Sequence, residues 1–135
     1  MFHCAAGKDR TGLLAALLLG LLGVSETDIL VDYAHSKRSM PRLRARWERR
    51  LAKDRAAGRP TRFANDEEWA RLADELLSAN RETMATTLAW LDGRHGSIAG
   101  WAHDHGFGAA EVAALQERLL EPADGGAANV PGEVP

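Results

Sequence analysis

The first residues of the chain combine a thiol, a glycine and a guanidinium group within one short stretch. Cys4 and Arg10 are separated by five residues in the segment HCAAGKDRTG, which spans positions 3–12. A loop of this length can curl so that successive backbone N–H groups point inward and bind an anion. In such a loop the thiolate of Cys4 would be the nucleophile, because a positive local field lowers the pKa of a thiol. Arg10 would hold two oxygens of a phosphate group with its planar fork.

The segment that follows the loop predicts the element that positions it. Residues 11–23, TGLLAALLLGLLG, are apolar on every side, which predicts a buried central helix that ends at Gly23. The N-terminus of a helix carries partial positive charge, which favours both bound phosphate and a thiolate. A cysteine and an arginine at this spacing are weak evidence in a chain rich in arginine. Gly7, which permits a tight backbone, and the Thr11–Gly12 pair at the helix start make the pattern specific.

The rest of the chain shows helical periodicity and no strand pattern after Cys4. We expect six further helices, over residues 25–39, 41–58, 66–77, 83–91, 97–106 and 109–120. Pro41 disfavours helix at Met40, and Gly93 would end the fourth of these helices. The side chains expected to face inward include Ile29, Leu30, Tyr33, Leu43, Trp47, Leu51, Trp69, Leu72, Leu76, Leu77, Met84, Leu88, Leu91, Val112, Leu115 and Leu119. The fold class is therefore mainly α, with strand residues only at Met1–His3.

Composition excludes several classes of function. A chain of 135 residues, 45% of them apolar, is expected to form one domain with a real core. The net charge of −2 gives no overall attraction to nucleic acid. The single cysteine excludes an internal disulfide, and no apolar stretch reaches the roughly 18 residues of a membrane span. We expect a cytoplasmic protein, with secretion without a visible signal as the alternative, and a flexible tail over 122–135. The sequence does not set the oligomeric state.

One stretch departs from this charge balance. Residues 37–62 contain eleven Lys or Arg and only two acids, Glu48 and Asp54, so the local charge is +9. Two interpretations stay open for this segment. It is either a solvated helical excursion or a lid and surface for anionic substrates or lipid headgroups.

The opening segment resembles the active-site signature HCxxGKDRTG of the cysteine-dependent protein tyrosine phosphatases. The resemblance is closest to the bacterial tyrosine/serine phosphatase family. Residues 25–38, SETDILVDYAHSKR, resemble the D-Y-x-x-S helix of that family, and residues 82–120 resemble its C-terminal helical block. His95 stands where the family usually has tyrosine. The resemblance covers residues 2–120.

The resemblance implies a role for each residue of the signature. Cys4 would form a phosphocysteine intermediate, and Arg10 would bind the phosphoryl oxygens. Thr11 would hydrogen-bond the sulfur and assist turnover of the intermediate, although a helix N-cap role is also open. His3 and Gly12 would support the loop structurally. The residues that would donate backbone N–H groups to the phosphate are Ala5, Ala6, Gly7, Lys8, Asp9 and Arg10.

Two charged residues of the signature keep alternative roles. Lys8 would add charge for doubly phosphorylated or phosphoinositide substrates, or it is a solvated surface lysine. Asp9 is a candidate proton donor, or it anchors the loop by pairing with a basic group.

The resemblance also implies a fold and a reaction. Residues 1–121 would be the C-terminal helical half of an α/β cysteine-phosphatase catalytic domain whose sheet lies upstream of this sequence. The substrate would be a phosphorylated protein or a phosphoinositide, and no cofactor is implied. No metal site is expected, because the histidines outside the loop (His35, His95, His103 and His105) lack metal-binding spacing.

Two other function classes stay open at this point. The chain could be a catalytically inactive fragment that acts as an interaction domain or has no function. It could also belong to the low-molecular-weight phosphatase or arsenate reductase type, but that fold needs βαβ units after the loop.

Overall fold

The computed structural model of the chain describes residues 4–63 and 65–121. The expectations for His3, for strand at Met1–His3 and for the tail over 122–135 lie outside the described residues. The described residues contain helices and no strand, so the expectation of a mainly α chain is confirmed for them. The elements in chain order are α1 (Asp9–Leu21), α2 (Glu26–His35), a short 3₁₀ helix η1 (Ser36–Ser39), α3 (Met40–Ala56), α4 (Asp66–Leu76), α5 (Arg81–His95), α6 (Ile98–Asp104) and α7 (Ala109–Leu119).

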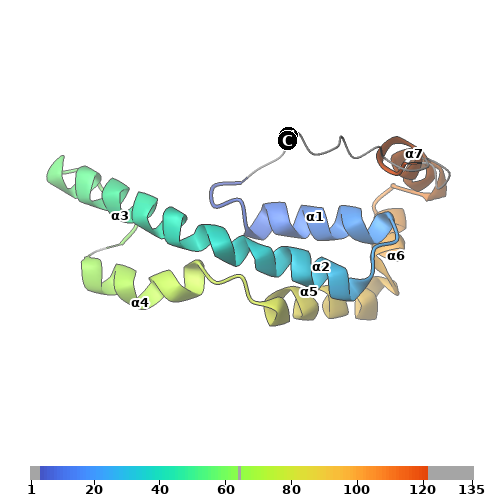
Figure 1. The fold of residues 1–135 in the computed structure, drawn as a ribbon, viewed down its shortest axis with the longest axis horizontal. Helices are drawn as coiled ribbons and strands as arrows, with labels where there is room; N and C mark the ends of the chain where they lie inside the picture. The colour runs from blue at the N-terminus through green and yellow to red at the C-terminus, as the bar shows by residue number, and fades with distance from the viewer. Residues whose placement is uncertain (1–3, 64, 122–135) are drawn as a thin grey trace, which may run out of the picture.

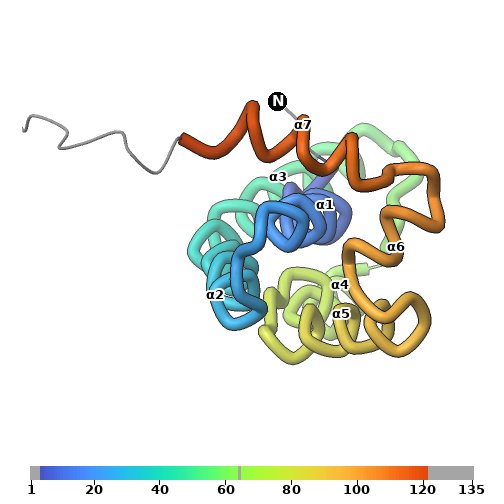
Figure 2. The backbone as a smooth tube through the Cα atoms, turned by 90° about the vertical axis from the view of Figure 1, so that its right-hand side faces the viewer, coloured from blue at the N-terminus to red at the C-terminus, as the bar shows by residue number. Residues whose placement is uncertain are grey.

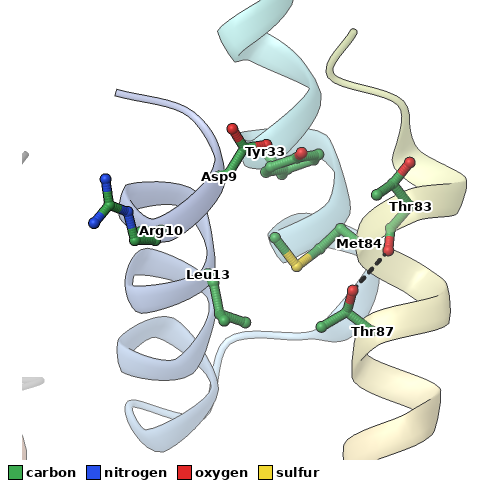
Figure 3. Close-up of a pocket in the computed structure, with 7 residues that line it drawn as sticks. All are labelled: Asp9, Arg10, Leu13, Tyr33, Thr83, Met84 and Thr87. Atoms are coloured by element: carbon green, nitrogen blue, oxygen red, sulfur yellow. Dashed lines mark hydrogen bonds between the residues drawn. The ribbon is translucent and has the colours of Figure 1, made fainter. Parts of the chain in front are cut away.

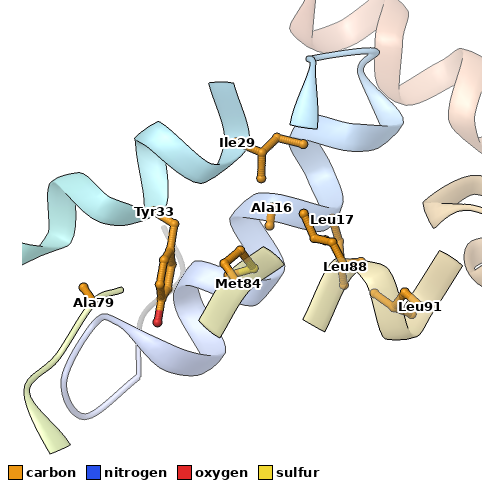
Figure 4. Close-up of a cluster of buried hydrophobic side chains, with 8 residues drawn as sticks. All are labelled: Ala16, Leu17, Ile29, Tyr33, Ala79, Met84, Leu88 and Leu91. Atoms are coloured by element: carbon orange, nitrogen blue, oxygen red, sulfur yellow. The ribbon is translucent and has the colours of Figure 1, made fainter. Parts of the chain in front are cut away.

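One hydrophobic core joins α1, α2 and α5, with α6 packed against its edge (Figures 1 and 4). As expected from the spacing of their apolar residues, α2 and α5 both turn one apolar face inward. The buried side chains of this core are Ala16, Leu17, Ile29, Tyr33, Ala79, Met84, Leu88 and Leu91. This bundle supports the helix that begins at the loop.

A second core holds α3 against α4. These two helices extend past the N-terminal end of α1 as an arm (Figure 1). Trp69 is 4% exposed, and its ring centroid lies 5.7 Å from that of Trp47 and 5.1 Å from that of Phe63. The predicted apolar stripes of the two helices are confirmed, because Leu43, Trp47 and Leu51 pack on the same cluster as Leu72 and Leu76.

The apolar helix of the sequence prediction is buried on one side only. Leu17 and Leu21 are each 8% exposed, whereas Leu14 is 41% exposed. The bundle therefore covers one face of the helix, and part of its apolar circumference, including Leu14, stays exposed. The C-terminal end is as expected, because Gly23 has a φ of +85°. The Val24 N–H then donates to the Leu19 carbonyl at 3.0 Å. This bond gives a partner to one of the carbonyl groups that the C-terminal end of the helix leaves free.

Two expectations about residues that break helices are wrong. Helix α5 runs through Gly93 to His95, and Gly96, with a φ of +75°, forms its C-terminal cap. Glycine inside a helix costs only about 1 kcal/mol, so Gly93 alone does not end α5. Met40 is helical although Pro41 follows it, because Pro41 occupies the first turn of α3, where a missing N–H is tolerated. The α-helix expected over residues 25–39 ends at His35, and residues 36–39 connect α2 to α3 as the 3₁₀ helix η1.

Helix α7 lies across one end of the bundle (Figure 2). A hydrogen bond joins α7 to α1, in which Gln116 Nε2 donates to the Leu21 carbonyl oxygen at 2.9 Å. The expectation that Leu119 faces inward is wrong, since this side chain is 58% exposed, whereas Val112 and Leu115 are partly buried. None of the helices in the described ranges is long and apolar enough to span a lipid bilayer.

Candidate active site

The loop from Cys4 to Lys8 leads directly into the first turn of α1. Gly7 has a φ of +68°, a conformation that L side chains rarely adopt, so the tight turn of the loop requires glycine there. The Gly12 N–H donates to the Lys8 carbonyl at 2.7 Å and closes the first turn of the helix. Helix α1 begins at Asp9, two residues earlier than the sequence predicted.

Donors from the loop and from the first turn of α1 act on the sulfur of Cys4. They lower the pKa of the Cys4 thiol from 9.0 to about 6, and the hydroxyl and the backbone N–H of Thr11 contribute most. The backbone N–H groups of Ala6 and Lys8 lower the pKa further, while partial burial opposes them. With a pKa of about 6, Cys4 is mostly a thiolate at neutral pH and is a strong nucleophile.

Thr11 lies in the third position of α1 rather than at its cap. The N-cap residue is Lys8, so the N-cap role considered for Thr11 is wrong. The Thr11 hydroxyl oxygen is buried and has no hydrogen-bond partner of normal geometry among the described residues. Its closeness to Cys4 is nevertheless the largest cause of the lowered thiol pKa, so the sulfur is the acceptor available to this hydroxyl.

Lys8 and Asp9 form an ion pair at the base of the loop. The Lys8 side chain is buried, and its Nζ contacts the Asp9 carboxylate, which is 66% exposed. The alternative of a solvated surface lysine is therefore wrong. Asp9 lies in the first turn of α1, where a carboxylate interacts favourably with the helix dipole.

Arg10 extends away from the bundle on the exposed side of α1 (Figure 3). In the part of the chain that the structure describes, its guanidinium group takes part in no ion pair or hydrogen bond. A guanidinium group without a competing carboxylate is available to an incoming anion.

A pocket of about 250 Å³ lies beside the loop, between α1, α2 and α5 (Figure 3). Its lining is mostly apolar, and Figure 3 shows Asp9 and Tyr33 at the same end of the pocket. Sequence reasoning placed Tyr33 in the core but did not connect it with the loop. The lining residues are Asp9, Arg10, Leu13, Tyr33, Thr83, Met84 and Thr87.

The basic segment forms much of the arm, and several of its arginines are already paired there. Arg44 binds Asp74 at 2.6 Å and Arg55 contacts Asp66, so both tie α3 to α4. Arg50 and Arg59 both bind Asp54 and hold its pKa below the usual value. Part of the +9 charge is therefore used to hold the arm together.

Comparison with known proteins identifies the family. The family model described as the tyrosine phosphatase family matches residues 1–121. The chain belongs to the tyrosine phosphatase family. The triple specificity protein phosphatase PtpB of Mycobacterium tuberculosis is 35% identical over 121 residues, which are 87% of this chain and 42% of that protein. A tyrosine-protein phosphatase of Nostoc commune is 58% identical over 36 residues, 27% of this chain and 12% of that protein.

The helices that follow the loop argue against one of the alternatives left open by the sequence. The low-molecular-weight type would require strands after the loop, and residues 4–63 and 65–121 contain none. The chain spans less than half the length of PtpB.

Proposed function

We propose that the chain supplies the nucleophile and the phosphate-binding loop of a phosphatase that hydrolyses phosphate monoesters. The observation that carries the proposal is the Cys4 thiol, with a pKa of about 6, at the start of α1 among N–H donors of Ala6, Lys8 and Thr11. Donors that stabilise a negative sulfur can also bind the oxygens of a phosphoryl group, where charge develops during transfer. Membership of the tyrosine phosphatase family supports the same reaction.

The reaction has two steps in this proposal. The Cys4 thiolate attacks phosphorus, a sulfur–phosphorus bond forms, and the bond from phosphorus to the leaving oxygen breaks as that oxygen takes up a proton. Water then attacks the phosphocysteine and loses a proton, the sulfur–phosphorus bond breaks, and inorganic phosphate leaves while the thiolate is regenerated. Thr11 would stabilise the departing sulfur in this second step, because its hydroxyl is available to the sulfur.

Arg10 would bind two phosphoryl oxygens in both steps. The backbone N–H groups from Ala5 to Arg10 would bind the others, with Gly7 allowing the curl of the loop. Asp9 has two candidate roles. As a carboxylate it pairs with Lys8, and as a protonated carboxyl group it would be the candidate proton donor to the leaving oxygen.

We propose that residues 1–121 form the C-terminal part of an α/β catalytic domain. The exposed side of α1, including Leu14, supports this assignment, because it offers apolar surface to a sheet. The arm would act as a lid or as a surface for anionic substrates, and the substrates would be phosphotyrosine, phosphoserine or phosphothreonine in proteins, or phosphoinositides. The proposed role of the arm is supported by its position, because it extends past the N-terminal end of α1, where the loop lies (Figure 1).

The experiment that tests the proposal is hydrolysis of p-nitrophenyl phosphate by the whole catalytic domain that contains this chain. We expect turnover that Cys4→Ser abolishes, because a serine hydroxyl is far less ionised than this thiol. Ser78→Ala, a change after α4 and outside the loop, is the matched control and should keep turnover. Equal turnover by the wild type and Cys4→Ser would contradict the proposal. A folded wild type with no turnover would favour the alternative of an inactive interaction domain.

A further inference from the structure

Tyr33 of α2 lies directly against the backbone of α1 at Gly12. A Cβ atom added at Gly12 would lie 2.8 Å from Cδ2 and 2.8 Å from Cε2 of the Tyr33 ring. Carbon atoms that are not bonded do not approach this closely, so the ring and any side chain at position 12 exclude each other. Helices α1 and α2 can approach this closely because Gly12 has no side chain.

The Tyr33 ring is fixed on its other sides. It is 5% exposed and belongs to the core cluster that also holds Ala16, Ile29 and Met84. Figure 4 shows the ring pointing from α2 toward the N-terminal turn of α1. Because α2 packs against both α1 and α5, the ring can move away from Gly12 only if the core repacks.

Gly12 belongs to the helical turn that presents donors to Cys4. Its N–H bonds to the Lys8 carbonyl at 2.7 Å, and Thr11 is the residue before it. Lys8 and Thr11 are two of the three residues whose backbone N–H groups act on the sulfur. A displacement of Gly12 along or across the helix axis would therefore turn these N–H groups away from Cys4.

We propose that Tyr33 is a positioning residue for the active-site loop, whose ring, seated on the bare backbone of Gly12, holds the first turn of α1 with its donors directed at Cys4. The inference deepens the proposed function and rests on Cys4 being the nucleophile. The contact is made by ring carbons, so the ring rather than the hydroxyl carries the effect. Tyr33 also lines the pocket beside the loop together with Asp9. The same ring therefore belongs both to the hydrophobic core and to the lining of this pocket.

The test measures how fast iodoacetamide alkylates Cys4 across pH 5 to pH 10 in the 135-residue chain. The wild type should give a midpoint near pH 6, in line with the thiol pKa of about 6. Tyr33→Ala should raise the midpoint and lower the alkylation rate at pH 6 by about five- to tenfold, as expected for a midpoint above about pH 7. Tyr33→Phe keeps the ring and should leave the rate at pH 6 within about twofold of the wild type.

Leu91→Ala is the matched control for loss of core packing. Leu91 is buried in the same cluster to a similar degree, 4% exposed against 5% for Tyr33, but it lies on α5 toward its C-terminal end. This variant should lower the melting temperature and leave the alkylation midpoint near pH 6. A shift of the midpoint in Leu91→Ala as large as that in Tyr33→Ala would overturn the inference, because any loss of core packing would then have the same effect.

Two further variants keep the inference testable if Tyr33→Ala does not fold. Tyr33→Leu keeps apolar volume without the ring and should raise the midpoint. Gly12→Ala should raise it as well, and it should add little in the Tyr33→Leu background, because the clash partner is gone. A folded Tyr33→Ala or Tyr33→Leu variant with a midpoint still near pH 6 would overturn this inference but not the proposed function. A wild-type midpoint near pH 9 would instead overturn the proposed function, and this inference with it.

Discussion

Replacing Thr11 by valine should weaken the field that keeps Cys4 ionised. Valine has nearly the same shape as threonine but lacks the hydroxyl, which is the largest cause of the lowered Cys4 pKa. The backbone N–H groups of Thr11, Ala6 and Lys8 remain, so the pKa should rise only part of the way from about 6 toward 9.0. In the folded variant the Cys4 thiol therefore keeps its proton to a higher pH than in the wild type.

The expected size of this effect follows from the titration of a single thiol. At pH 6 the wild type is about half thiolate, because its pKa is about 6. If the pKa of the Thr11→Val variant is about 7, its thiolate fraction at pH 6 is about one tenth, which lowers the alkylation rate about fivefold. At pH 10 both proteins are almost fully ionised, so their rates should agree within about twofold.

The assay is iodoacetamide alkylation of Cys4 at pH 6 and pH 10, followed by mass spectrometry of the intact chain. Thr11→Ser, which loses a methyl group but keeps the hydroxyl, is the matched control and should behave like the wild type at both pH values. A Thr11→Val rate equal to the wild-type rate at pH 6, with the helical circular dichroism spectrum retained, would refute the reasoning that the hydroxyl acts on the sulfur.

Three further outcomes are expected. The wild-type melting temperature should rise from pH 6 to pH 9 by more than that of Cys4→Ser. The reason is that the folded thiol, with its pKa lowered to about 6, holds fewer protons in this window than the unfolded thiol at 9.0; equal slopes would contradict it. Trp69→Ala should destabilise the arm by about 3–5 kcal/mol, seen as faster hydrogen exchange in α3 and α4, while α1 and α2 keep their protection. Asp9→Asn should slow hydrolysis of phenyl phosphate much more than that of p-nitrophenyl phosphate if Asp9 protonates the leaving oxygen, whereas an equal loss would indicate that Asp9 only anchors the loop.

Features set by local spacing could be predicted from the sequence. The loop between Cys4 and Arg10, the end of α1 at Gly23 and the apolar stripe from Leu43 to Leu51 each depend on residues a few positions apart. The N-terminal cap at Ser97 belongs to the same class, because its hydroxyl oxygen accepts a hydrogen bond from the Gly100 N–H at 2.9 Å.

Other features depend on contacts between distant residues. The clash that reserves position 12 for glycine comes from Tyr33, twenty-one residues away, and no local pattern marks it. The burial of Lys8 could not be predicted either, since lysine side chains are usually solvated. The exposure of Leu119 reflects the small contact that α7 makes with the bundle, although its own spacing resembles that of a packed helix.

The central claim is that the Cys4 sulfur attacks phosphorus, and the most direct measurement is a search for the phosphorylated sulfur. The whole catalytic domain that contains this chain is mixed with p-nitrophenyl phosphate, quenched in acid within the first turnover, digested and analysed by mass spectrometry. The proposed reaction predicts one phosphoryl group on the peptide that contains Cys4, with no such group in Cys4→Ser. Release of p-nitrophenol without any phosphoryl group on Cys4 would contradict it.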